Sequence, residues 1–195
     1  MTKIVVFTGA GVSADSGIST FRDSDGLWAN YRIEDVCTPE ALVRNRAQVI
    51  EFYNIRRREL FSVEPNAAHR AIAELEQYFD VEVVTQNVDN LHERAGSTRV
   101  THLHGELMKL RSERNPELIV PIEGWEQKMD ARAEDGALLR PHIVFFGELV
   151  PMFDREFPDV YITKSPSNRL FPTSFIKIVE FVKSIWNCPL GPPLP

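Results

Sequence analysis

The sequence predicts an α/β protein with a doubly wound parallel sheet, because strand-like and helix-like segments alternate along its first half. A β-branched run at residues 3–8 enters a glycine-rich turn that opens a helix. An amphipathic helix at 66–79 precedes a second apolar run at 81–86. A helix at 88–96 then leads to a short strand at 101–105. In such sheets, ligands bind at the carboxyl ends of the strands.

Two stretches are expected to be insertions that form a smaller lobe. These are helical material at about 32–62, with a helix at 39–62, and a charged, irregular segment at 108–136. A loop is expected at 19–31, and residues 140–150 form one more apolar run. The first 154 residues are therefore predicted to be one α/β core with a small lobe inserted in it.

The helix at 66–79 carries its own start signal. Asn66 is a favoured N-cap residue, and Ala71, Leu75 and Phe79 lie on one helical face. We therefore expect a single amphipathic helix that packs on the sheet.

Composition excludes several classes of function. The net charge of −6 argues against general nucleic-acid binding, which needs a basic face. No run approaches the roughly 18 apolar residues of a membrane span. The first residues, MTKIVVFTGAG, enter a strand directly and show no secretory signal. A cytoplasmic protein without nucleic-acid or membrane partners is the expectation.

The two cysteines, Cys37 and Cys188, provide neither a disulfide framework nor a paired-cysteine metal site. A structural zinc held by four thiolates is impossible with two cysteines. No metal is therefore expected in this protein.

The segment at 155–195 differs in character from the rest of the chain. Eight of the thirteen prolines lie at or after Pro151. One amphipathic helix is expected at 173–187, with no further strand-and-loop motif around it. This segment is predicted to be an atypical tail.

The glycine-rich turn at residues 9–14 fits the pattern G-x-G-x-x-A. Its glycines let the backbone approach a pyrophosphate, and the helix start supplies N–H donors. An ordinary tight turn between strand and helix explains the same residues. The acid that usually binds a ribose at the end of the second strand is not evident.

The loop that follows contains Phe21, Arg22 and Asp23, an aromatic residue next to a charged pair. A loop of this kind can close over a cofactor and exclude water. The alternative is a surface loop with a salt bridge.

Polar residues gather after the second and third strands. Gln86, Asn87 and Asp89 can hydrogen-bond a sugar or an amide, although helix N-capping is an alternative role. His104 can act as a general base, although a lone histidine is more often structural. His102 is expected to point to the opposite face of the strand from His104. With His92, these histidines match no usual metal-ligand spacing.

Four motifs occur together in order: GAGVSADSGISTFRDSDGLW, TQNVDNLHERAG, HLHGEL and RPHIVFFGE. The chain from residue 3 to about 154 resembles the sirtuins, which are NAD-dependent protein-lysine deacylases with a Rossmann-like fold. The resemblance implies transfer of an acyl group from lysine to NAD, giving nicotinamide, free lysine and O-acyl-ADP-ribose. It implies that His104 is the catalytic base and that Asn87 and Asp89 act beside it. The cofactor residues that it implies are Gly9, Ala10, Gly11, Ser13, Ala14, Gly17, Phe21, Arg22, Asp23, Trp28, Gln86, Asn87, Val88 and Asp89.

The resemblance also implies a substrate site for acylated-lysine proteins or peptides. The segment expected to pair as a strand with the peptide consists of Val144, Phe145, Phe146, Gly147 and Glu148. Tyr53 and Arg56 match a sirtuin subgroup that binds the carboxylate of succinyl- or malonyl-lysine, and they share one helix face. The alternative is that Tyr53 is a core residue and that Arg56, Arg57 and Arg58 form a solvated basic run.

Two departures from the family pattern stand out. The four zinc cysteines that most sirtuins carry between the strands at 101–105 and 140–150 are absent. After Asp154 the later family motifs are absent, so the sheet is expected to lack its last strands, as after a frameshift or truncation.

From the absence of these last strands we expect weak NAD binding, low stability and self-association. An inactive or binding-only protein and a mono-ADP-ribosyltransferase remain alternative functions, and the oligomeric state is open.

Overall fold

The computed structural model describes residues 2–18 and 30–150. The predicted loop residues Phe21, Arg22, Asp23 and Trp28 lie outside this part, as does the tail helix expected at 173–187. Within the described residues, no helix is both long and apolar enough to cross a membrane.

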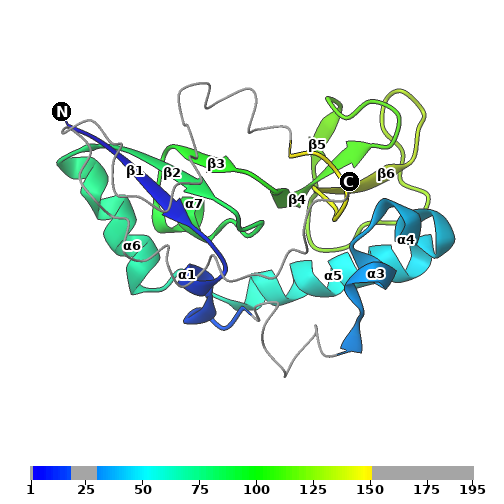
Figure 1. The fold of residues 1–195 in the computed structure, drawn as a ribbon, viewed down its shortest axis with the longest axis horizontal. Coiled ribbons are helices and arrows are strands. Elements are labelled where there is room, and N and C mark those ends of the chain that lie inside the picture. The colour runs from blue at the N-terminus through cyan, green and yellow to red at the C-terminus, as the bar shows by residue number, and fades with distance from the viewer. Residues whose placement is uncertain (1, 19–29, 151–195) are drawn as a thin grey trace, which may run out of the picture.

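A three-stranded parallel sheet forms one end of the described structure (Figure 1). Its strands are β1 (Lys3–Thr8), β2 (Asp80–Thr85) and β3 (Val100–His102), in the order β1-β2-β3. The register pairs Lys3 with Asp80 and Thr8 with Thr85, so β1 and β2 end at the same edge. The predicted Rossmann-like α/β class is confirmed.

One face of this sheet packs against helical residues that are close in sequence to β2. The strand residues on this face are Ile4, Val6, Val81 and Val83. The residues packed on them, from α6 (Ala67–Glu74), η1 (Leu75–Gln77) and the turn after η1, are Ile72, Leu75 and Phe79. Helix α7 (Leu91–Ala95) contacts α6. Helices α6 and α7 are therefore neighbours beside the sheet.

The prediction of a single helix at 66–79 is partly wrong. Asn66 does cap it, accepting hydrogen bonds from the backbone N–H groups of Ala68 and His69. The α-helix ends at Glu74, however, and continues as one turn of 3₁₀-helix to Gln77. Such tightening satisfies the last carbonyl groups of a helix.

The predicted helix at 39–62 consists of two helices, α4 (Pro39–Arg44) and α5 (Arg46–Ser62). Asn45 interrupts it, with φ −148° and ψ 71°, and its side chain accepts a hydrogen bond from the N–H of Gln48. A residue that caps a new helix cannot continue the previous one. A short helix, α3 (Ile33–Val36), precedes the pair.

A second, antiparallel sheet contains β4 (Gly105–Ser112), β5 (Ile119–Pro121) and β6 (Leu139–Ile143), in the order β5-β4-β6. The prediction that 108–136 is irregular throughout is therefore wrong. The prediction of a strand at 101–105 is also wrong at its end, since β3 stops at His102.

Gly105 explains where the chain changes sheet. Its φ is +84°, and a Cβ atom at this position would lie 2.1 Å from the carbonyl oxygen of His142. Only glycine fits such a close approach at positive φ. This residue redirects the chain from β3 into β4.

Helix α5 runs below β4 in Figure 1 and packs against β4 and β6. Its apolar residues join the larger hydrophobic core, which includes Val49, Phe52, Tyr53 and Leu60. Arg57 on the same helix is fully buried, donating from Nε to the carbonyl oxygen of Leu107 at 2.8 Å. A long helix thereby joins the smaller lobe to the region of the parallel sheet.

Charge pairs and hydrogen bonds connect the segments of the smaller lobe. Ser112 donates to Asp135 at 2.7 Å, and Arg46 pairs with Glu113. The described residues contain no group of three or more His, Cys, Asp or Glu side chains that could bind a metal ion. Packing and these polar contacts account for the order of the lobe.

Replacement of Gly96 by alanine should destabilise the protein by about 1 kcal/mol. Gly96 ends α7 with φ +109°, and an added Cβ would be 3.8 Å from Ala73, so the cost is conformational rather than steric. Urea unfolding measures it. Gly11→Ala is the matched control, because Gly11 faces open space at the start of α1 (Gly11–Ala14). Equal stability of the two variants would contradict this explanation.

Candidate active site

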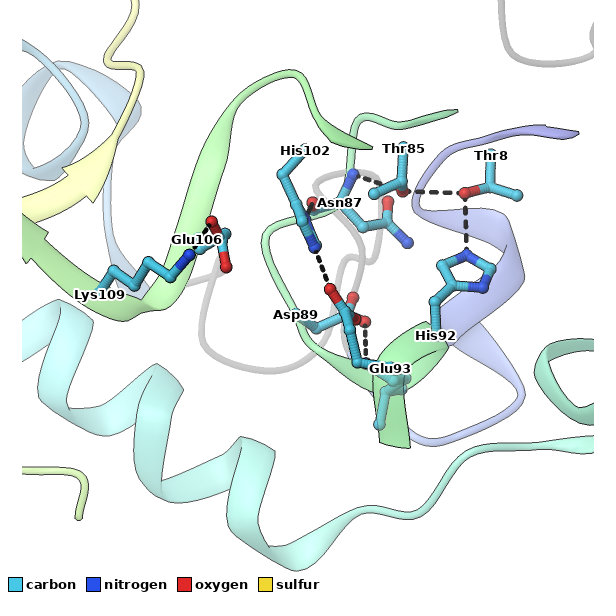
Figure 2. Close-up of polar contacts among 10 residues, drawn as sticks. Thr8, Thr85, Asn87, Asp89, His92, Glu93, His102, Glu106 and Lys109 are labelled. Atoms are coloured by element: carbon cyan, nitrogen blue, oxygen red, sulfur yellow. Dashed lines mark hydrogen bonds and ion pairs between the residues drawn. The ribbon is translucent and has the colours of Figure 1, made fainter. Parts of the chain in front are cut away.

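The carboxyl ends of β1 and β2 carry hydroxyl groups that start a polar network (Figure 2). Thr8 Oγ1 donates to Thr85 Oγ1 at 2.8 Å, and Thr85 Oγ1 accepts from the backbone N–H of Asn87 at 3.0 Å. Both threonines are buried. The network fixes the start of the loop at 86–90 relative to β1.

Ser13 joins the glycine-rich turn to this loop. Its hydroxyl donates to Asp89 Oδ2 at 3.0 Å and accepts from Asn87 Nδ2 at 3.0 Å. Asn87 and Asp89 are only 8% and 6% exposed. Three residues that the sequence placed in the site therefore meet, although they come from segments more than 70 residues apart.

Asp89 also serves the alternative role considered for it. Its Oδ1 accepts a hydrogen bond from the N–H of Leu91 at 3.2 Å, at the start of α7. The structural and the functional readings of this carboxylate are thus compatible, because its two oxygen atoms have different partners.

His104 lies just beyond β3, with its Nδ1 3.0 Å from the carbonyl oxygen of Gln86. A carbonyl oxygen only accepts, so Nδ1 carries the proton and Nε2 keeps its lone pair. Burial lowers the pKa of His104, and the hydrogen bond to Gln86 offsets this only in part. The ring is therefore neutral near pH 7 and is prepared to accept a proton at Nε2.

The expectation that His102 points away from His104 is wrong. The Nδ1 atom of His102 lies 2.8 Å from the carbonyl oxygen of Asn87, in the same loop that His104 contacts. Residues two apart in an extended segment share one face, so the alternation of side chains in fact places His102 and His104 on the same side.

A second pair of histidines lies behind the site, and sequence reasoning missed one of them. His92 Nε2 is 3.0 Å from Thr8 Oγ1, and the His69 ring packs edge-on against it with centroids 4.8 Å apart. Burial and the neighbouring His69 lower the pKa of His92 to about 4. His69 reaches back to the N–H of Asn66 at 3.3 Å, a capping-box contact usually made by Glu or Gln.

The glycine-rich turn has the space that a dinucleotide phosphate needs. A Cβ atom on Gly11 would meet no atom of the described residues within 4 Å, and Ser13 with its partners lies two residues further along the chain. Gly9 and Ala10 shape the turn, their carbonyl groups accepting hydrogen bonds from Val12 and Ser13. These residues fit a dinucleotide.

Other predicted cofactor residues have structural roles. Gly17 has φ +90° in the turn after Ala14. Val88 is half-buried and packs against the larger core. Gln86 is half-buried at the end of β2, where its N–H donates to the carbonyl oxygen of Thr8.

Tyr53 and Arg56 lie next to each other, as their spacing predicts. Tyr53 is 1% exposed, its hydroxyl 3.5 Å from Cys37 Sγ and its ring stacked on Phe145. The guanidinium of Arg56 lies 5.8 Å from the ring centroids of Phe52 and Tyr53. Tyr53 is therefore packed in the core, as the alternative reading held, and a role of its hydroxyl group toward a substrate stays a prediction.

The same alternative was wrong about the arginine run as a whole. Arg57 is buried, whereas Arg58 is exposed and lies over the ring of Trp125 at 3.9 Å. The three consecutive arginines thus have three different environments.

The segment expected to be a substrate-pairing strand is not a strand. β6 ends at Ile143, and the chain then forms a turn in which the N–H of Glu148 donates to the carbonyl oxygen of Phe145. The N–H of Val144 donates to the carbonyl oxygen of His104 at 2.9 Å. These contacts occupy backbone donors within the chain, and pairing of this segment with a substrate peptide stays a prediction.

The fold and the site define a class of protein: a Rossmann-like α/β protein with polar side chains converging at the carboxyl ends of a parallel sheet, as in dinucleotide-binding enzymes. The profile described as the Sir2 family matches residues 9–165, and the chain belongs to this family. The match extends beyond residue 154, where the resemblance was expected to end.

Characterised relatives agree with this assignment. An NAD-dependent protein deacylase of Aggregatibacter actinomycetemcomitans is 58% identical over 77% of this chain and 72% of the relative. One from Bacteroides thetaiotaomicron is 50% identical over 89% of this chain and 79% of the relative.

Solved structures share the fold. A mutant Sir2 homologue in complex with ADP ribose has a TM-score of 0.70 at 41% identity, over 78% of this chain and 63% of the other. A complex of a Sir2 homologue with NAD has a TM-score of 0.68 at 42% identity, over 78% of this chain and 61% of the other. The chain thus spans less than two thirds of these structures.

Proposed function

We propose that this protein is an NAD-dependent protein-lysine deacylase. The observation that carries the proposal is the position of His104, whose Nδ1 is bonded to Gln86 and whose Nε2 is left as a base, against the loop that brings Asn87 and Asp89 to Ser13. The relatives that are named NAD-dependent protein deacylases support it.

Each part of the site has a role in this reaction. Bound NAD supplies a ribose carbon that exchanges nicotinamide for the acyl oxygen of the substrate. The glycine turn at 9–14 would hold its phosphates, while Asn87 and Asp89 would orient its nicotinamide and ribose. His104 Nε2 accepts the proton of a ribose hydroxyl. Burial keeps this histidine neutral, as a general base requires.

Product analysis of the full chain tests the proposal. The protein is incubated with NAD and an acetyl-lysine or succinyl-lysine peptide. Nicotinamide, deacylated peptide and O-acyl-ADP-ribose should then form in equal amounts. Transfer of ADP-ribose to protein without deacylation would indicate the transferase alternative. Calorimetric NAD binding without turnover would indicate a binding-only protein.

The acyl preference is a finer part of the same proposal. We propose that Arg56, with Tyr53, receives the carboxylate of succinyl- or malonyl-lysine. The support is the position of the Arg56 guanidinium beside two aromatic rings of the core, since guanidinium and phenol together are an effective carboxylate receptor.

The double substitution Arg56→Met with Tyr53→Phe should reduce kcat/KM for succinyl-lysine about ten- to a hundred-fold more than for acetyl-lysine, because it removes charge-assisted hydrogen bonds. Peptide kinetics with both substrates measure the difference. Arg58→Met is the matched control, since Arg58 on the same helix lies over Trp125. An equal loss on both substrates would show that the pair is only structural.

A further inference from the structure

Two histidines hold two successive carbonyl groups of the loop that follows β2. His104 Nδ1 contacts the carbonyl oxygen of Gln86 at 3.0 Å, and His102 Nδ1 contacts that of Asn87 at 2.8 Å. The two rings differ in their second nitrogen. His102 Nε2 faces the carboxylate of Glu93 on α7 at 2.7 Å, as Figure 2 shows.

The partners of His102 determine its protonation. A carbonyl oxygen and a carboxylate oxygen both accept hydrogen bonds, and a neutral imidazole has a single N–H to donate. Both contacts are satisfied together only when the ring is an imidazolium. The side chain is 4% exposed, so water cannot replace either partner cheaply.

The charges around His102 support this state. Burial alone would lower the pKa of His102, but the hydrogen bond and the charge of Glu93 outweigh it, and the pKa is raised. Glu106 on β4 adds to the rise, although it also pairs with Lys109 at 2.7 Å. His92 on α7 offers no competing positive charge, because its own pKa is about 4.

We propose that His102 is a positioning residue: as an imidazolium between Glu93 and the Asn87 carbonyl group, it orders the loop at 86–89 and sets the alkaline limit of activity. The proposal rests on the proposed deacylase function. According to this proposal, His102 is charged and His104 is neutral during the same reaction.

The pH window follows from the direction of each shift. The contribution of His102 is complete below its unfolded pKa and is lost as the pH rises through its raised folded pKa. Burial would raise the pKa of Glu93, but the hydrogen bond and charge of His102, with smaller effects, together outweigh it, and the pKa is lowered. The contribution of Glu93 is therefore lost only as the pH falls through this lowered pKa. His104 must be neutral, which its lowered pKa permits. Activity should therefore fall on the alkaline side as His102 deprotonates.

NMR of the ring nitrogens tests whether His102 is an imidazolium between Glu93 and the Asn87 carbonyl group, without any need for turnover. In the full-length protein at about pH 7.5, both nitrogens of His102 should be protonated and His104 should be neutral. In Glu93→Gln, the glutamine amide can donate to Nε2, so His102 should be neutral at the same pH. The amide of Val88, which follows the Asn87 carbonyl, should titrate together with His102 in the unmodified protein. A neutral His102 in the unmodified protein would overturn the proposal.

Kinetics test the functional part. In the unmodified protein, kcat/KM should fall at alkaline pH with the titration of His102. This fall should be absent from Glu93→Gln. In Glu93→Ala, kcat/KM should be lower by about ten-fold or more at all pH values. Glu82→Gln is the matched control, because Glu82 pairs with Lys3 and contacts no histidine. A Glu93→Gln profile identical to the unmodified one would overturn the proposal. Absence of turnover in the unmodified protein would refute the deacylase function instead. The NMR experiment would still determine whether His102 is protonated on both nitrogens.

Discussion

Replacement of His104 by alanine should lower kcat/KM for deacylation by about 10²- to 10⁴-fold, the usual contribution of a general base. His104 presents an unprotonated Nε2 next to the loop that carries Asn87 and Asp89, because its Nδ1 donates to the carbonyl oxygen of Gln86. The loss should appear in kcat rather than in NAD affinity, since the base acts after the cofactor is bound. Peptide kinetics, together with calorimetric titration of NAD, separate the two quantities.

The fold should survive this change. His104 is half-buried and its side chain has a single hydrogen bond to the described backbone, so circular dichroism and the melting temperature should change little. His142→Ala is a suitable control, because His142 lies on β6 and its buried Nδ1 has no hydrogen-bond partner among the described residues. Activity retained by a folded His104→Ala protein would remove His104 from the catalytic role.

Replacement of Glu148 by glutamine should destabilise the protein by about 3 kcal/mol, because it leaves two largely buried arginines without their counter-charge. Glu148 accepts hydrogen bonds from Arg140 at 2.6 Å, from Arg111 at 3.0 Å and from the N–H of Phe145 at 2.7 Å. The two arginine side chains are 9% and 12% exposed. The turn at 144–148 is thereby tied to β4 and β6.

The pKa of Glu148 gives the sign of the pH dependence. Burial would raise this pKa, but the hydrogen bonds from Arg140 and Phe145 outweigh it, and the pKa is lowered. Its contribution to stability is therefore present above the unfolded pKa of a glutamate and is lost as the pH falls through the lowered folded value. The stability of Glu148→Gln should lack this part of the acid dependence.

Thermal melting at neutral pH measures the loss. For a chain of this size, about 3 kcal/mol corresponds to a decrease of about 6–12 °C in Tm. Glu82→Gln removes the carboxylate of a more exposed ion pair and should change the free energy of unfolding by less than about 1 kcal/mol. Equal Tm values for the two variants would show that the Glu148 contacts contribute no more than a surface pair.

Local sequence patterns were enough to predict much of the parallel-sheet region. The β-branched run at 3–8, the glycine turn after it and the cap residue Asn66 have the predicted structure. Such signals are local, because strand propensity, capping and positive φ depend on neighbouring residues. The polar residues at the end of β2 were predicted for the same reason, since buried polar groups need partners.

The smaller lobe could not be predicted in the same way. Its strands β4, β5 and β6 lie in or beside a charged segment whose residues follow no clear period of two. Antiparallel pairing of β4 with β6, which joins residues as distant as Gly105 and Ile143, and the close approach at Gly105 stabilise this sheet. Both arise from contacts between distant parts of the chain, which a local pattern does not record.

The sequence by itself determined the family, the class of fold and the residue types available for chemistry, because these depend on the order of motifs and on local propensity. Only the tertiary structure decided which partner each of these residues has. Ser13 meets Asp89 across 76 residues, Arg111 meets Glu148 across 37, and α7 places the carboxylate of Glu93 against Nε2 of His102, which raises the pKa of that histidine. The protonation state of a buried group depends on its neighbours in space, and folding brings those neighbours together from distant positions in the chain.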